Sequence, residues 1–142
     1  MKPVLLVVAP YYREIADMLI TGARAALEQA GHPHELIEVP GAFEIPAAIA
    51  LAHKSGRYDG YVALGCVIRG ETSHYDIVCN ESARGLQNLA VREHAAIGLG
   101  ILTTEDIQQA ILRADPAQGN KGGEAAQAAL RMIQLKREFG VV

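Results

Sequence analysis

The order of apolar segments along the chain is the feature that most restricts its fold. Val4–Ala9 is a continuous apolar run that ends at Pro10, which is typical of a strand covered on both faces. The pattern predicts strands at residues 4–9, 35–39, 61–66 and 95–102, and helices at 14–30, 46–54, 73–93, 104–113 and through 125–133. Because strands and helices alternate, we expect an α/β fold, a three-layer α/β/α sandwich around a four-stranded parallel sheet.

Length and composition exclude several other classes of protein. With 142 residues, 50% of them hydrophobic, the chain has the size of one domain, residues 1–142, and too much apolar surface for a disordered protein. A net charge of −3 without a run of Lys or Arg argues against nucleic-acid binding, and no apolar stretch is long enough to cross a membrane. The first apolar run lacks a cleavage site, so we interpret it as a strand and not as a signal peptide. Cys66 and Cys79 lack metal-ligand spacing, which indicates reduced thiols in the cytoplasm.

The loops that follow the predicted strands are the expected ligand-binding segments, because ligands bind beyond the carboxyl ends of parallel strands. The segment 65–75 is the richest in chemistry. Gly70 permits a sharp turn, and Thr72 or Ser73 can cap the helix that follows, whose free N–H groups would attract an anion. His74, in the first helical turn, can act as an acid or a base near neutral pH. The alternative is an ordinary capped helix whose histidine faces solvent.

Other candidate residues have both a structural and a functional interpretation. Tyr11 is a stacking platform or a rim residue, and Glu44 is a helix N-terminal carboxylate or an acceptor for ligand hydroxyls. Arg113 complements a helix dipole, and Lys121 is a solvated charge in a Gly-rich loop. The chain has no dinucleotide-binding or P-loop spacing. No metal-ligand pattern joins the remaining histidines, which we expect at the surface: His32, His34, His53 and His94.

Four segments together resemble lumazine synthase, an enzyme of riboflavin biosynthesis. They are Val39–Pro46, Gly65–His74, Gly100–Glu105 and Gly119–Gly122, in an order and spacing that extend the resemblance over nearly the whole chain. The resemblance implies a flavodoxin-like sheet and a condensation without cofactor or metal. In that reaction 5-amino-6-ribitylamino-pyrimidinedione and 3,4-dihydroxy-2-butanone 4-phosphate give 6,7-dimethyl-8-ribityllumazine, phosphate and water.

The resemblance also implies roles for individual residues. His74 matches a proton-transferring histidine, and Arg113 matches an arginine that pairs with the substrate phosphate. The turn that holds this phosphate is Gly70, Glu71 and Thr72, and the Glu71 side chain must point away from the anion. The residues that match contacts to the pyrimidine substrate are Tyr11 as the stacking ring, with Tyr12 as the alternative, Ala42, Phe43 and Glu44 along the ribityl chain, Val67 and Ile68 at the heterocycle edge, Leu99 as an apolar wall, and Lys121 near a carbonyl.

The resemblance further implies a homopentamer whose active sites lie between subunits. Leu99, Arg113 and Lys121 would then come from the neighbour of the subunit that supplies His74. Whether pentamers assemble further, and whether riboflavin synthase is a partner, stays open. Three alternatives to catalysis of this reaction are a flavin- or lumazine-binding module, a cage-forming scaffold, and the riboflavin synthase activity found on this scaffold in some archaea.

Overall fold

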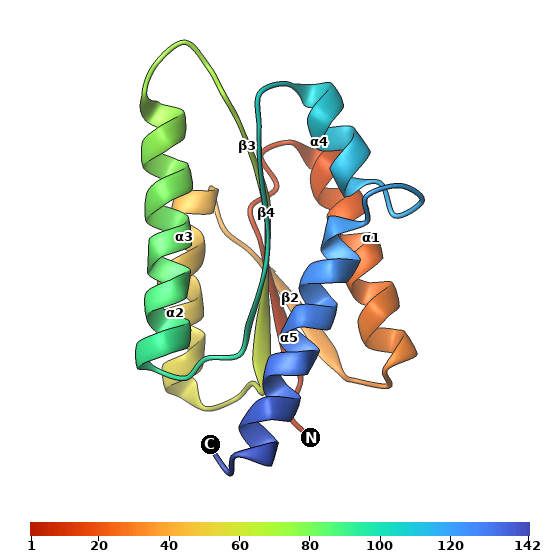
Figure 1. The fold of residues 1–142 in the computed structure, drawn as a ribbon, viewed down its shortest axis with the longest axis vertical. Coiled ribbons are helices and arrows are strands. Elements are labelled where there is room, and N and C mark those ends of the chain that lie inside the picture. Colours follow the sequence, from red (N-terminus) through yellow and green to blue (C-terminus); the bar gives the residue numbers. More distant parts are fainter.

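A central sheet separates two layers of helices in the computed structural model, which describes residues 1–142 (Figure 1). Helices α1, α4 and α5 cover one face of the sheet, and α2 and α3 cover the other. In chain order the elements are β1 (Val4–Val8), α1 (Arg13–Gln29), β2 (His34–Glu38), the 3-10 turn η1 (Ala42–Glu44), α2 (Ile45–Ser55), β3 (Gly60–Ile68), α3 (His74–Arg92), β4 (Ile97–Thr104), α4 (Ile107–Ala114) and α5 (Lys121–Glu138). The predicted three-layer arrangement is confirmed.

The sheet has the strand order β2-β1-β3-β4, and every neighbouring pair is parallel. Val4 pairs with His34 on one side and with Gly60 on the other, so β1 and β3 lie in the centre. The predicted four-stranded parallel sheet is therefore confirmed. All four strands end at the same edge, which brings the segments after β1, β2 and β3 together.

Both faces of β1 are buried, as the continuous apolar run predicts. Val4, Leu6 and Val8 face the core under α1, α4 and α5, and Leu5 and Val7 face the core under α2 and α3. None of the five is more than 1% exposed. Burial of a large aliphatic side chain contributes about 2 kcal/mol, so this strand is a main source of stability.

Glycine lets α5 lie very close to the sheet and to α1. A Cβ atom on Gly98 of β4 would lie 2.7 Å from the carbonyl carbon of Ala125 in α5. One on Gly122 would lie 2.9 Å from Cα of Leu19 in α1. Real Cβ atoms do not approach backbone this closely, so the thin layers depend on glycine at these two positions.

The ends of two strands differ from the predicted boundaries. β3 continues through Ile68, and β4 continues through Thr104, which is buried and belongs to the strand. The predicted start of the next helix at residue 104, with Thr104 as its capping residue, is therefore wrong. Asp106 caps α4, since its carboxylate accepts a hydrogen bond of 2.9 Å from the Gln109 N–H. A short acidic side chain on extended backbone is well suited to that position.

Two of the histidines predicted at the surface have structural partners. His32 is buried, and its Nε2 donates to the Lys2 carbonyl over 3.0 Å, so the surface prediction is wrong for this residue. His53 is half-buried between Glu93 and Tyr61: its Nε2 donates to the Glu93 carbonyl, which leaves Nδ1 to accept from the Tyr61 hydroxyl. These partners are distant in sequence, so spacing alone gives no sign of them.

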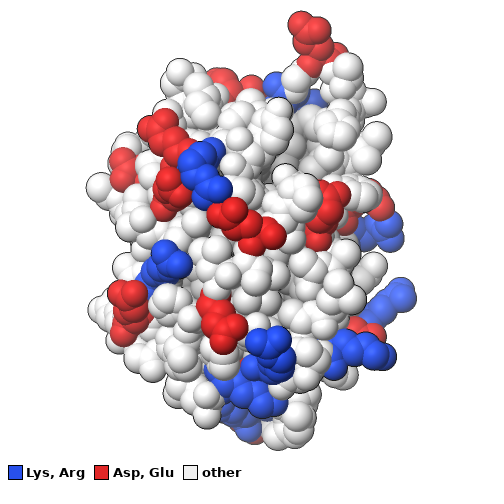
Figure 2. All heavy atoms as spheres, turned by 180° about the vertical axis from the view of Figure 1, so that it is seen from behind, with Lys and Arg blue, Asp and Glu red and all other residues white.

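Acidic and basic side chains are interspersed over the face of the molecule seen in Figure 2. Basic side chains gather at the lower end, which is the end where both chain termini lie (Figures 1 and 2). Part of the charge near the termini is already paired, because Arg137 bonds Asp59 over 3.1 Å and the Lys2 amine donates to the Gly56 carbonyl over 2.7 Å. None of the helices combines the length and the apolarity needed to span a bilayer.

Candidate active site

A pocket of about 590 Å³ opens at the carboxyl edge of the sheet. Its walls come from the segment after β1, the turn η1, the end of β3 and the start of α3, and most of them are apolar. The lining residues are Tyr11, Tyr12, Gly41, Ala42, Phe43, Glu44, Cys66, Val67, Ile68, His74, Ile77 and Val78. The structure thus brings together the segments that follow β1, β2 and β3, which are three of the loops expected to bind a ligand. A mainly apolar pocket with a few polar groups is the usual form of a small-molecule site.

Two tyrosine rings form one wall of this pocket. Tyr11 is 78% exposed, and its ring centroid lies 4.9 Å from that of Tyr12 in an edge-to-face arrangement. Tyr12 packs against the core, and its burial raises the pKa of its hydroxyl. Tyr11 is therefore the ring whose surface is open to a ligand, and Tyr12 supports it from below.

The turn η1 forms a second wall. Phe43 is 53% exposed, whereas Ala42 is buried. Glu44 is the N-cap residue of α2, yet its side chain makes no capping hydrogen bond. A Cβ atom on Gly41 would lie 3.2 Å from the Glu44 carboxylate, which shows that this carboxylate folds back over Gly41. Glu44 thus has the predicted helix N-terminal position, and its oxygens stay available as acceptors.

The turn between β3 and α3 carries His74 and a set of free backbone donors. The N–H groups of Gly70, Glu71 and Thr72 donate to no acceptor in the chain. His74 is the first residue of α3, and its own N–H donates to the Thr72 hydroxyl over 3.3 Å. Ser73, the other predicted cap, makes no capping bond with its side chain. Free N–H groups just before a helix start are the donors that the predicted anion site requires.

Glycine itself is not required by the conformation of this turn. Gly70 does not adopt the left-handed conformation, and a Cβ atom there would meet nothing within 4 Å. The sharp turn expected at Gly70 therefore does not depend on the left-handed conformation that glycine allows. Glu71 is exposed and forms no ion pair within the chain. The backbone of this turn, and not its side chains, presents the donors.

Some lining residues were missed from the sequence. Cys66 lies beneath the pocket, and its burial raises the pKa of the thiol to about 11, so the group is neutral. Ile77 and Val78 lie one helical turn after His74, and the helix period places them on the same side. That period was the signal that could have identified both. Both cysteines are free thiols in the structure, as predicted.

Six predicted residues do not line the pocket of this chain. Gly70, Glu71 and Thr72 belong to the turn between Ile68 and His74, which do line it, whereas Leu99, Arg113 and Lys121 lie on other elements. Leu99 in β4 is 56% exposed. Arg113, in the last turn of α4, is exposed and donates to the Gln109 carbonyl over 3.1 Å. Lys121 was expected in a loop, but it is the first residue of α5 and pairs with Glu124 over 2.9 Å. Lys121 therefore belongs to the first turn of α5 and not to the preceding loop.

Comparison with known proteins matches nearly the whole chain to one family. The sequence model of the 6,7-dimethyl-8-ribityllumazine synthase family matches residues 2–137. An enzyme of that name from Sphingopyxis alaskensis is 57% identical over 141 residues, which cover 99% of each chain. One from Zymomonas mobilis is 56% identical over 139 residues, covering 98% of this chain and 99% of the relative. The chain therefore belongs to the 6,7-dimethyl-8-ribityllumazine synthase family, a family of enzymes.

Proposed function

We propose that the protein condenses 5-amino-6-ribitylamino-pyrimidinedione with 3,4-dihydroxy-2-butanone 4-phosphate to give 6,7-dimethyl-8-ribityllumazine in riboflavin biosynthesis. The observation that carries the proposal is the pocket in which an exposed ring, an unengaged carboxylate and His74 meet beside free backbone donors. The name of the matching family supports the same reaction.

The pyrimidine substrate is proposed to lie against Tyr11, with its ribityl chain along Ala42, Phe43 and Glu44. The end of β3 offers groups for the edge of the heterocycle. β1 pairs with β3 only as far as Leu64, so the stretch containing Val67 and Ile68 has a strand partner on the β4 side alone. Alternate residues of a parallel strand bond to opposite sides, and Arg69 bonds toward Thr104 in β4. Ile68 therefore directs its backbone groups toward the open side.

The phosphate of the second substrate is proposed to bind the turn formed by Gly70, Glu71 and Thr72. The N-terminus of α3 favours an anion there through its dipole. The pyrimidine amine attacks the ketone and forms an imine with loss of water, phosphate then leaves, and the second amine closes the ring with loss of another water. His74 is placed to transfer protons in these steps, and positioning of the two substrates contributes much of the rate.

The site is proposed to be completed by a neighbouring subunit in a homopentamer. Leu99, Arg113 and Lys121 are exposed and lie outside the pocket of their own chain, as a contribution to a neighbour requires. Arg113 would pair with the substrate phosphate and stabilise its departure. Measurement of particle size would show whether pentamers assemble further. Co-purification would show whether they enclose riboflavin synthase. The free thiols support a cytoplasmic location.

A mixture of the two substrates with the purified protein tests the proposed reaction. We expect lumazine absorbance to rise faster than in the same mixture without protein. A rate equal to that of the uncatalysed condensation would refute the enzyme activity and favour a flavin- or lumazine-binding module. The apolar walls and the exposed Tyr11 ring would suit that second candidate.

The shared site has a test of its own. Arg113→Ala is expected to raise the KM for the phosphate substrate, and an unchanged KM would contradict the phosphate role. When Arg113→Ala and His74→Ala subunits are mixed and reassembled, about a quarter of the interfaces in random assemblies contain both native residues. Activity above that of either variant alone is expected. No recovery would show that both residues serve the same subunit's site.

A further inference from the structure

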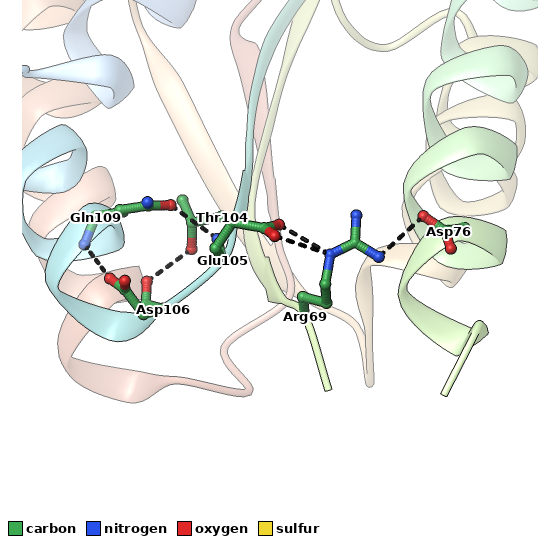
Figure 3. A network of polar contacts seen from close by, with 6 residues as sticks. All are labelled: Arg69, Asp76, Thr104, Glu105, Asp106 and Gln109. Carbon is green, nitrogen blue, oxygen red and sulfur yellow. Dashed lines mark hydrogen bonds and ion pairs between the residues drawn. The ribbon is translucent and has the colours of Figure 1, made fainter. Parts of the chain in front are cut away.

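Arg69 joins the start of α3 to the end of β4 (Figure 3). Its Nε donates to both carboxylate oxygens of Glu105, over 2.9 and 3.1 Å, and its Nη1 lies 3.4 Å from Asp76. The guanidinium carbon also lies 4.3 Å from the centre of the Tyr75 ring. One side chain thus contacts two elements that are distant in sequence.

The contacts on α3 fall directly beside His74. Tyr75 and Asp76 are the second and third residues of the helix that His74 begins. Ser73 provides no side-chain cap, and besides Arg69 the side-chain restraint on the backbone of this first turn is the hydrogen bond of 3.3 Å from the His74 N–H to the Thr72 hydroxyl. The Asp76 N–H donates to the Ser73 carbonyl over 3.0 Å, and the Ile77 N–H donates to the same oxygen.

The other side of the connection is firmly held. The Glu105 N–H donates to the Gln109 side chain over 2.8 Å, and the backbone N–H of Arg69 donates to the Thr104 carbonyl over 2.9 Å. Asp106 caps α4 at the same place. The Glu105 carboxylate is therefore attached to a turn with several fixed hydrogen bonds, against which Arg69 can hold the start of α3 (Figure 3).

The geometry points to Arg69 as a positioning residue for His74, which acts by holding the first turn of α3 against the end of β4. This inference rests on the proposed function, because it assigns His74 a part in the reaction. Both carboxylates that face the guanidinium already neutralise it. A fixed structural contact therefore fits Arg69 better than direct binding of the substrate phosphate. The planar guanidinium suits this role better than the ammonium of lysine, because its donors have a fixed arrangement and it stacks on aromatic rings more often.

Steady-state kinetics with Arg69→Ala and Arg69→Lys test the inference. We expect Arg69→Ala to lower kcat about tenfold, because a small displacement of a reacting group is costly, while the KM for the phosphate substrate changes by less than about twofold. Arg69→Lys should recover part of the lost kcat, since it keeps the charge. The matched control is Arg84→Ala, which removes an exposed arginine paired with Glu81 within α3 itself, and its kcat should equal that of the native protein.

Two kinetic results would overturn the inference. A higher KM for the phosphate substrate with an unchanged kcat would identify Arg69 as a direct phosphate ligand. A kcat equal to that of Arg84→Ala would show that the contacts at Arg69 have no effect on His74. If Arg69→Ala does not fold, Asp76→Asn weakens the α3 side of the same connection by removing the charge of the ion pair, and kcat is again expected to fall.

Amide hydrogen exchange separates this inference from the proposed function, since it needs no activity. The N–H groups of Asp76 and Ile77 report on the first turn of α3, and we expect them to exchange faster in Arg69→Ala than in Arg84→Ala. Equal exchange in the two variants would overturn the inference even if the protein is active. Absence of catalysis by the native protein, with faster exchange in Arg69→Ala, would refute the proposed function alone.

Discussion

Replacement of Gly98 by alanine tests the close contact between the sheet and α5. The added Cβ atom would overlap the backbone of Ala125, with its carbonyl carbon at 2.7 Å, and would lie 3.2 Å from the Ala129 nitrogen. Backbone atoms within a helix cannot turn aside as a side chain can, so we take the upper part of the overpacking range, about 3 kcal/mol. The lower entropy of the unfolded chain offsets about 0.7 kcal/mol. The expected loss of unfolding free energy is therefore about 2 kcal/mol.

Thermal unfolding followed by circular dichroism measures this loss. At about 4 °C per kcal/mol for a chain of this size, we expect Gly98→Ala to lower Tm by about 8 °C. Protein concentrations must be equal, because subunit association shifts apparent stability. Gly70→Ala is the matched control, since its Cβ atom would meet nothing within 4 Å, and its Tm should not fall. An unchanged or higher Tm for Gly98→Ala would refute the close approach of α5 to β4.

Two further predictions concern a helix cap and a buried thiol. Asp106→Ala removes the hydrogen bond to the Gln109 N–H and should lower the free energy of unfolding by about 1 kcal/mol in urea titrations; an unchanged value would show that the cap contributes nothing. Burial raises the pKa of Cys66 from 9.0 to about 11, so the folded state holds its proton more tightly than the unfolded chain. Stability from this group is therefore complete below pH 9 and should decline between pH 9 and about 11, and Cys66→Ala should flatten that decline relative to the native protein. Identical pH profiles for the two proteins would contradict the contribution of the thiol.

Apolar periodicity was sufficient to predict the architecture. The buried run that forms β1 and the alternation of strands with helices led to the four-stranded parallel sheet and its two helical layers. Boundaries were less well predicted, because Thr104 and Asp106 are both good capping residues and only the extent of β4 decides between them. The local sequence does not show where β4 ends, because the length of this strand depends on its pairing with β3.

Residues whose position follows from neighbouring residues in the sequence were predicted, whereas contacts between residues distant in the sequence were missed. His74 and Glu44 lie at helix starts that the sequence indicates directly, and the structure places both at one pocket. The burial of His32 was missed because its partner, the Lys2 carbonyl, is a backbone group far away in the sequence. The side-chain contacts of Arg69 with Glu105 were missed for the same reason, since α3 and β4 lie between the two residues in the sequence.

The rate of lumazine formation by His74→Ala at saturating substrate concentrations tests the central claim most directly. The account predicts a slower rate than that of the native protein, with an unchanged Tm because the His74 side chain is exposed. The decrease is expected to be modest, since positioning of the substrates supplies part of the rate. His34→Ala, at the opposite end of the sheet, should keep the native rate and serves as the control. A native rate for His74→Ala would contradict the assignment of proton transfer to this pocket.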